Sequence, residues 1–236
     1  MTNCKKAQGA RTHRQRVLLF IRVPEIGRVK TRLAKRIDTK TTLALYRCFV
    51  EDILETLAAG GYGTTVFFTP ADKGPAVQAW LAENTHIQPQ TGKNLGQRMR
   101  NAFLSTFATQ VDQAVLMGSD FPDLDIRIIR EAFYALQKRD VVIGPARDGG
   151  YYLIGFRKNA FREDVFQGVD WGTDRVFQQT LGQIRNADLG SHTLPVWQDI
   201  DTYEDLLAFY GRNTTRTRSH LKTMKLLDRH FLKGSP

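Results

Sequence analysis

The chain first becomes apolar at Val17-Leu18-Leu19-Phe20-Ile21-Arg22-Val23, and Pro24-Glu25-Ile26-Gly27-Arg28-Val29-Lys30-Thr31-Arg32-Leu33 follows at once. The short apolar run, bounded by Pro24 and Gly27, predicts a buried strand that ends in a loop. Apolar residues at helical spacing then continue from Leu33 to Leu57 and stop before Gly60-Gly61. The opening of the chain therefore predicts a strand, a basic loop and one long helix.

The same alternation of strands and helices continues to the C-terminus. Further strands are expected at 64–68, near Ile87, at 114–118, 141–144, 151–155 and 193–196, and helices around 77–81 and at 95–107, 126–137, 173–184, 203–210 and 219–232. Such alternation predicts a mostly parallel sheet covered by helices on both faces. The segments 141–144 and 151–155 are too close for a helical crossover, so an antiparallel element is also expected. The fold class is thus α/β, with three layers (α/β/α) and a mostly parallel mixed sheet.

Composition and length favour an ordinary globular protein of the cytoplasm. The 236 residues are 42% hydrophobic and 25% charged, which excludes the disordered and collagen-like classes. The apolar run at 17–21 is far shorter than the roughly 20 residues of a membrane-spanning helix, so no membrane span and no export signal are expected. Cys4 and Cys48 lie in unlike contexts, a polar start and a helical pattern, and do not suggest a disulfide framework.

The formal net charge of +10 is concentrated at the two ends of the chain. Residues 1–16 carry five basic and no acidic side chains, residues 211–236 carry seven basic and one acidic, and the body is nearly neutral. We therefore expect a single domain at 17–210 with basic tails at 1–16 and 211–236, the second partly helical. Binding of nucleic acid by these tails is an alternative that this distribution does not favour over solvated ends.

The basic loop after the first strand is a candidate phosphate site. In open α/β sheets ligands bind beyond the carboxyl ends of the strands. Pro24 and Gly27 shape the turn, Lys30 and Arg32 supply positive charge, and the amides of a following helix could face an anion. The Walker A pattern is missing from this loop, and a plain solvated helix start remains the alternative.

Two acidic segments follow other predicted strands. Asp120 comes after the strand at 114–118, where it is either a helix cap or a metal ligand; Asp123 and Asp125 are better placed as caps. Asp201 lies in an acidic stretch after the last strand, where it or Thr202 could equally cap a helix. If the carboxylates of Asp120 and Asp201 converge, Mg²⁺ or Mn²⁺ between them and a diphosphate would offset their repulsion.

Two glycine-containing segments add candidate substrate contacts. Asp148 is followed by Gly149 and Gly150 and then by Tyr151, which is consistent with a simple hairpin turn or with close approach of a substrate to the backbone. Gly96 and Arg98 open the helix at 95–107 and could contact a nucleotide, a plain helix start being the alternative.

Together these motifs resemble a known family, the radical-SAM/selenodomain-associated glycosyltransferases of GT-A type. The resemblance spans roughly 17–210 and is carried by Pro24-x-x-Gly27-x-x-Lys30-Thr31-Arg32-Leu33, Leu95-Gly96-x-Arg98-Met99, Gly118-x-Asp120-x-Pro122, Gly144-Pro145-Ala146-x-Asp148-Gly149-Gly150-Tyr151-Tyr152-Leu153 and Asp199-x-Asp201-Thr202-x-x-Asp205-Leu206. Ser119 and Phe121 stand where the family more usually has Thr and Cys. The first and last motifs are also similar to those of 2-phospho-L-lactate guanylyltransferase and other nucleotidyltransferases.

The resemblance implies a nucleotide-diphospho-sugar transferase fold and a metal-dependent enzyme. The residues and the resemblance together assign Asp120 and Asp201 to the ion, and Lys30 and Arg32 to the phosphates, with Lys30 also taking part in catalysis. Pro24, Gly27, Gly96, Arg98, Gly149, Gly150 and Tyr151 would contact the substrates, with Asp148 as a possible catalytic base.

The expected reaction is transfer of a sugar from a nucleotide sugar to a small-molecule acceptor. The alternative is nucleotidyl transfer from a nucleoside triphosphate.

Overall fold

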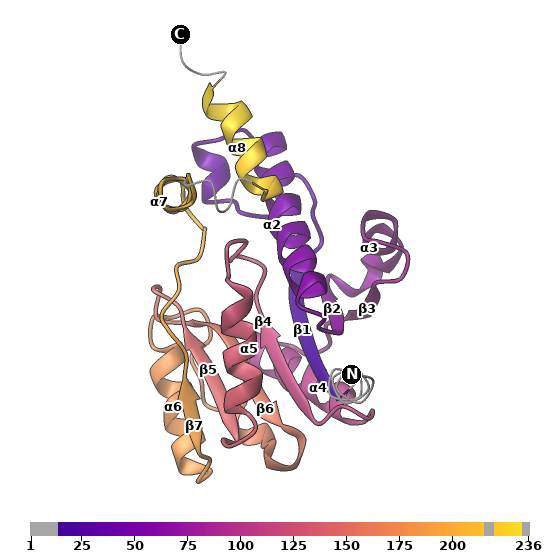
Figure 1. Ribbon diagram of the computed structural model, residues 1–236, viewed down its shortest axis with the longest axis vertical. Helices are drawn as coiled ribbons and strands as arrows, with labels where there is room; N and C mark the ends of the chain where they lie inside the picture. The colour runs from indigo at the N-terminus through magenta and orange to yellow at the C-terminus, as the bar shows by residue number, and fades with distance from the viewer. Residues whose placement is uncertain (1–13, 215–219, 233–236) are drawn as a thin grey trace, which may run out of the picture.

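The computed structural model describes residues 14–214 and 220–232 and contains a mixed seven-stranded sheet. The strands are β1 (Gln15–Arg22), β2 (Thr64–Thr69), β3 (His86–Pro89), β4 (Gln113–Met117), β5 (Val141–Pro145), β6 (Tyr151–Arg157) and β7 (Ser191–Thr193), in the spatial order β3-β2-β1-β4-β6-β5-β7 (Figure 1). Strand β6 is antiparallel to both of its neighbours, β4 and β5, and the other pairings are parallel. The predicted mixed, mostly parallel sheet and its antiparallel element at 141–155 are confirmed.

Helices cover both faces of this sheet. They are α2 (Thr39–Ala59), α3 (Gly74–Trp80), α4 (Leu95–Phe107), α5 (Ile126–Ala135), α6 (Val176–Asn186), α7 (Tyr203–Asn213) and α8 (Lys222–Leu232), with short 3₁₀ turns η1 (Leu33–Lys35), η2 (Ala71–Lys73), η3 (Lys158–Ala160) and η4 (Glu163–Phe166). Alternate residues of β1 enter two separate cores: Leu19 packs with α2 and α5, and Leu18 with α4 and α6. The predicted three-layer α/β/α architecture is therefore confirmed.

The long helix expected from Leu33 to Leu57 is interrupted near its start. Residues 33–35 form only a 3₁₀ turn, and α2 begins at Thr39. Asp38 causes the break, because its carboxylate accepts hydrogen bonds from the backbone amides of Lys40 and Thr41, both at 2.9 Å. This capping arrangement requires a non-helical residue at position 38. The basic loop consequently has no α-helix start beside it, and that part of the prediction is wrong.

The C-terminal segment is more ordered than a basic tail. Helix α8 lies beside α2 (Figure 1), and it places Leu221, Met224 and Leu227 in the main core. Asp52 of α2 is buried and caps α8, accepting hydrogen bonds from the amide of Lys222 (2.7 Å) and from the amide and hydroxyl of Thr223 (2.9 and 2.6 Å). The described part of 211–236 is therefore integral to the fold, whereas residues 1–13 of the other expected tail lie outside the described residues.

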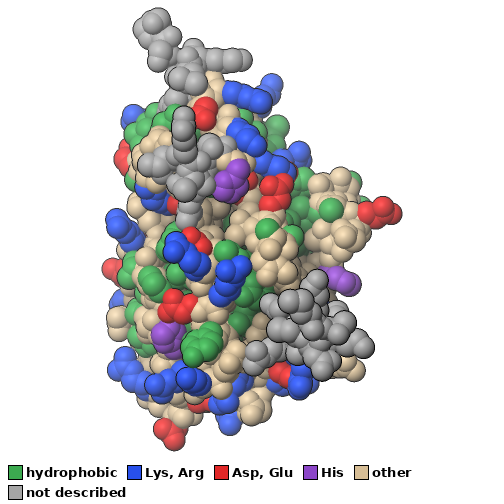
Figure 2. Space-filling model, viewed as in Figure 1, with side chains coloured by type: hydrophobic (Ala, Val, Ile, Leu, Met, Phe, Trp, Pro, Cys, Tyr) green, Lys and Arg blue, Asp and Glu red, His purple; other side chains and the backbone are tan. Residues whose placement is uncertain are grey.

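The visible surface carries basic and acidic side chains together. Figure 2 shows Lys and Arg scattered over this face with Asp and Glu among them, without one continuous basic field. Within 14–214 and 220–232, no helix has the length and apolar character to cross a membrane.

The Asp52 cap yields a prediction about stability. Replacing Asp52 with Ala would leave two backbone amides and one hydroxyl of α8 without their acceptor in a buried place. We expect the free energy of unfolding in urea to fall by about 2 kcal/mol. Glu55→Ala is the matched control on the same helix, since Glu55 only makes an exposed ion pair with Lys222, worth less than about 1 kcal/mol. Equal losses in the two variants would contradict a capping role for Asp52.

Candidate active site

The carboxyl ends of the parallel strands meet at one edge of the sheet, and their loops form the candidate site. The loops follow β1, β4, β5 and β7, and the last of them is joined to the second by a hydrogen bond from the Ile200 amide to the Asp120 carbonyl (3.1 Å). A cleft of about 490 Å³ opens here; Arg32, Asp120, Asp148, Tyr151, Trp171 and Asp199 are among its lining residues. The strand topology thus gathers side chains that are far apart in the sequence.

Lys30 is not among the residues that line the cleft; it lies behind Asp120 and connects it to Asp201. The backbone at Lys30 has a φ of +48°, which is rare for a residue with a side chain. Its ammonium nitrogen lies 2.8 Å from Oδ1 of Asp120 and 3.4 Å from Oδ1 of Asp201, and its side chain is only 5% exposed. Burial alone would lower the pKa of Lys30, but the charges of Asp120 and Asp201 outweigh it and raise the pKa above its ordinary value. The amine is therefore a fixed internal cation.

Arg32 is the basic side chain of this loop that faces the cleft. It is exposed, and its Nη1 atom donates to Oδ2 of Asp201 at 2.9 Å. Both carboxylate oxygens of Asp201 are therefore bound to cations of the same loop. Asp201 lies close to Asp120, as expected, but the ammonium of Lys30 stands between their carboxylates.

Asp199 is a site residue that our sequence analysis did not select. It lines the cleft together with Asp120 and Asp148. Burial, and then the negative charge of Asp148, raises the pKa of Asp199 to about 6. The only signal in the sequence was its place two residues before Asp201. A sequence pattern does not tell which of these two aspartates faces the cleft.

The Asp148 loop is held by its own backbone. The amide of Gly150 donates to Oδ1 of Asp148 at 2.9 Å, and both residues line the cleft. Gly149 has a φ of +88°, and a Cβ atom there would lie 2.1 Å from the carbonyl oxygen of Asp174. Glycine is therefore required at 149 because the backbone of Asp174 packs against it, whether or not a substrate approaches there.

An aromatic wall closes the side of the cleft next to α4. The ring of Trp171 lies against Gly96, where a Cβ atom would come within 2.6 Å of it, and it meets the Tyr151 ring edge to face at 6.5 Å. The Tyr151 hydroxyl donates to the sulfur of Met99 (3.7 Å). Trp171 was missed from the sequence because it belongs to an irregular loop. Gly96 thus makes room for Trp171.

Arg98 is turned toward its own loop. Its Nε atom donates to the carbonyl of Gly92 at 3.2 Å, and its side chain is not among those that line the cleft. Pro24 and Gly27 belong to the turn after β1. Pro24 is buried, and Gly27 is exposed with a φ of +70°, a conformation that glycine adopts without strain.

Some acidic residues near the site cap helices, and one, Asp123, is buried and accepts hydrogen bonds from three other side chains. Asp125 caps α5 through the amide of Arg127, and Thr202 caps α7 in a capping box with Asp205; both caps were expected. Asp123 is not a cap. It is buried and accepts hydrogen bonds from Arg212 Nε (2.7 Å), Asn213 Nδ2 (3.0 Å) and Trp197 Nε1 (3.1 Å). It therefore fastens α7 and the loop that carries Asp199 to the loop that carries Asp120.

The donor chemistry of the cleft suits a hard divalent cation. Asp120, Asp148 and Asp199 present carboxylate oxygens, which Mg²⁺ and Mn²⁺ prefer. No group of three or more His, Cys, Asp or Glu within ligand distance of one point is found in the described parts of the chain. A bound ion would therefore be completed by oxygens of a substrate or of water.

Comparison with protein families identifies the chain. Residues 53–173 match the family model DUF2064, which carries the description "Uncharacterized protein conserved in bacteria". The chain belongs to the DUF2064 family. Its sequence is also 22% identical over 211 residues to 2-phospho-L-lactate guanylyltransferase of Methanocaldococcus jannaschii, covering 87% of this chain and 88% of the relative.

Solved structures show the same fold. A Desulfovibrio desulfuricans G20 protein, provisionally named a nucleotide-diphospho-sugar transferase, is 39% identical with a TM-score of 0.89, covering 93% of this chain and 96% of that one. Rv0371c of Mycobacterium tuberculosis H37Rv, solved with manganese, is 16% identical with a TM-score of 0.51, covering 82% and 96%. This DUF2064 protein thus has the nucleotide-diphospho-sugar transferase-like fold that the sequence predicts.

The burial of Asp199 and the negative charge of Asp148 beside it predict a gain in stability when the Asp199 carboxylate is removed. Because folding raises its pKa from 3.8 to about 6, the folded state holds this proton more tightly, and ionisation of Asp199 costs stability as the pH rises through that window. Without divalent ions, Asp199→Asn should raise the free energy of unfolding at pH 7 by about 1 kcal/mol, a figure reduced for solvent screening.

Urea titrations in EDTA from pH 4 to pH 8 would measure this difference. It should shrink as the pH falls toward 4, because Asp199 is then protonated in the folded state and partly protonated in the unfolded state, where its pKa is near 3.8. Asp174→Asn is the control, since Asp174 is an exposed residue of the same cleft. A destabilised Asp199→Asn protein at pH 7 would contradict the assigned repulsion.

Proposed function

We propose that this protein is a metal-dependent transferase that binds a nucleotide by its phosphates and transfers a sugar from a nucleotide sugar to a small-molecule acceptor. The observation that carries the proposal is the set of three carboxylates, Asp120, Asp148 and Asp199, around one cleft with Arg32 at its edge. Such a site binds a diphosphate only together with a divalent cation, because bare carboxylates would repel it.

The structure favours Asp120 and Asp199 as the ligands of that ion. Both face the cleft, and burial together with the charge of Asp148 raises the pKa of Asp199, so a bound cation would relieve the cost of its negative charge. Asp201, our sequence candidate, already binds Lys30 and Arg32, so we assign it the role of holding these two cations in place. The ion, Mg²⁺ or Mn²⁺, would neutralise the diphosphate as it leaves.

The remaining side chains have distinct parts in this proposal. Arg32 is exposed and would bind phosphate oxygens. Lys30 would fix the position of Asp120 from behind, while its charge adds to the positive potential at the leaving group. The wall of Tyr151 and Trp171 would border the nucleotide, with Gly96 making room for Trp171, while Pro24, Gly27 and Gly149 shape the loops around it. Arg98, turned toward Gly92, is given no part.

Asp148 is the candidate base toward the acceptor. It is exposed, and one of its oxygens accepts only the amide of Gly150. The other oxygen is available to take a proton from an acceptor hydroxyl. The resemblance to GT-A glycosyltransferases and the 39% identical relative named a nucleotide-diphospho-sugar transferase support sugar transfer.

Nucleotidyl transfer is the second candidate. The similarity to a guanylyltransferase extends over 87% of the chain, and the positive charge of Arg32 at the cleft suits a triphosphate as well as a departing diphosphate. The two reactions differ in the bond broken: at the sugar carbon in one, and at the α-phosphorus in the other.

The metal assignment predicts loss of ion-dependent nucleotide binding. In thermal-shift titrations with GDP, UDP or CDP, the wild type should be stabilised more when Mn²⁺ is present than when it is absent. Asp120→Asn and Asp199→Asn should each abolish that difference. Asp205→Asn is the control: it weakens the α7 cap by up to about 1 kcal/mol but should keep the Mn²⁺ effect. Unchanged Mn²⁺ dependence in both site variants would sink the assignment.

The reaction predicts which product is released. With Mn²⁺, a panel of nucleotide sugars and a cell extract as source of acceptor, we expect acceptor-dependent release of a nucleoside diphosphate, measured by ion-pair chromatography. Asp148→Asn should lower that rate by at least about 100-fold. Release of pyrophosphate from a triphosphate, with every nucleotide sugar left intact, would replace sugar transfer by nucleotidyl transfer.

A further inference from the structure

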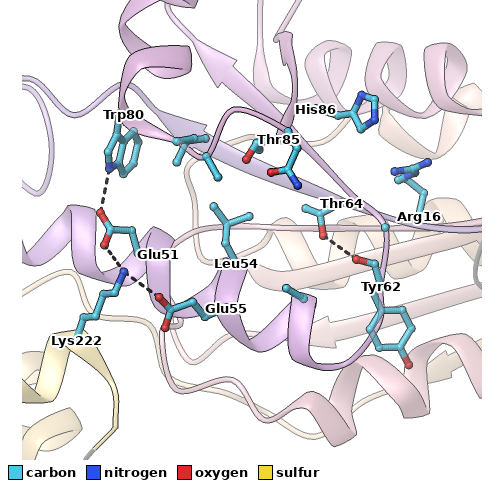
Figure 3. A pocket seen from close by; sticks show the side chains of 15 residues that line it. Arg16, Glu51, Leu54, Glu55, Tyr62, Thr64, Trp80, Thr85, His86 and Lys222 are labelled. Carbon is cyan, nitrogen blue, oxygen red and sulfur yellow. Dashed lines mark hydrogen bonds and ion pairs between the residues drawn. The ribbon is translucent and has the colours of Figure 1, made fainter.

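A second cavity lies at the opposite edge of the sheet from the candidate active site. Its volume is about 630 Å³, larger than the cleft, and it is lined at the amino ends of β1, β2 and β3 by Arg16, Thr64 and His86. Helix α2 forms its floor, and Trp80 at the end of α3 and Lys222 of α8 close one end (Figure 3). None of its lining residues takes part in the cleft.

The walls of this cavity combine apolar and polar side chains, and two of its aromatic rings have fixed partners. Leu54 and Ala58 of α2 contribute aliphatic surface. The Trp80 indole nitrogen donates to Glu51 (3.1 Å), with the guanidinium of Arg47 over the ring, and the Tyr62 ring stacks on Phe133 with centroids 5.1 Å apart. A preformed concave site of this size and lining is typical of places where small organic molecules bind.

The two ends of the cavity carry different charged groups: Lys222 with two glutamates at one end, and Arg16 at the other. At the Trp80 end, one ammonium is shared by two carboxylates, because Lys222 lies 2.7 Å from Glu51 and 2.8 Å from Glu55. At the other end the guanidinium of Arg16 lies over Gly63, where an added Cβ would come within 2.9 Å of its Nη1 atom. Arg16 has no acidic partner among residues 14–214 and 220–232. His86 and the hydroxyl of Thr64 stand beside it (Figure 3).

We infer that this cavity binds a small organic anion with an aromatic or apolar body, whose carboxylate or other acidic group pairs with Arg16. The body would lie on Leu54 and Ala58 between Arg16 and the ring of Trp80. An anionic group is favoured at the Arg16 end because no described carboxylate pairs with Arg16 there, while Glu51 and Glu55 share Lys222 at the other end of the cavity. Guanidinium and carboxylate form two parallel hydrogen bonds, which orients the ligand.

The three tryptophans of the chain make a direct test possible, because each reports on a different place. Trp80 lines this cavity, Trp171 lines the cleft, and Trp197 is bound to Asp123. The full-length ¹⁵N-labelled protein would be titrated with naphthalene-1-carboxylate while the three indole N–H signals are followed by NMR. Trp80→Phe and Trp171→Phe assign the signals. We expect a saturable shift of the Trp80 signal and none of the Trp171 signal.

Charge dependence separates this site from nonspecific apolar binding. Arg16→Met keeps the length of the side chain and should weaken binding of the probe about tenfold. Arg14→Met is the matched control, since Arg14 lies two residues earlier, pairs with Asp112 and does not line the cavity; it should change the affinity less than about twofold. The unchanged Trp197 signal in each variant shows that the fold is kept. The neutral analogue 1-naphthalenemethanol should bind more weakly than the carboxylate.

Several outcomes would overturn the inference. They are a Trp80 signal that does not move at any probe concentration, equal affinities for the carboxylate and the alcohol, equal affinities of the Arg16→Met and Arg14→Met proteins, or a shift confined to Trp171. None of these results bears on the metal or the reaction at the cleft.

Discussion

The contact on which the candidate site depends is the buried ammonium of Lys30 between Asp120 and Asp201. These carboxylates follow two different strands, β4 and β7, and without a cation they would repel each other at the separation that the structure gives them. Lys30 is kept in a strained backbone conformation, with a φ of +48°, to reach this position. One side chain thus ties the loop after β1 to the two acidic loops and fixes the back of the cleft.

The front of the cleft has the opposite electrostatic character. Asp120, Asp148 and Asp199 face one space, where burial and the charge of Asp148 raise the pKa of Asp199. The buried Asp123 network holds this arrangement in place by joining α7 and the Trp197 loop to the loop after β4. In the function that we propose, a bound ion offsets the negative charge of these carboxylates, which is why the same residues cost stability and serve binding.

Much of the fold could be predicted because periodicity is a local property. Short apolar runs predicted most of the strands, and the spacing of apolar residues predicted helices such as α4 and α5. The predicted helix from Leu33 to Leu57 was wrong at its start, because Asp38 caps α2 and the helix begins only at Thr39. The role of residues 220–230 was also misjudged, since their basic side chains suggested a tail, whereas Leu221, Met224 and Leu227 form part of the core.

The sequence by itself determined the fold class, and it predicted the edge of the sheet and the loops of the candidate site, because parallel strands have their carboxyl ends at the same edge of a sheet. Only the tertiary structure decided which side chains face the cleft. It distinguished Asp199 from Asp201, turned Arg98 toward Gly92, brought Trp171 against Gly96, and paired Lys30 with two aspartates. The physical reason is that side-chain direction within an irregular loop has no period; it is set by contacts with segments distant in sequence, which no local pattern encodes.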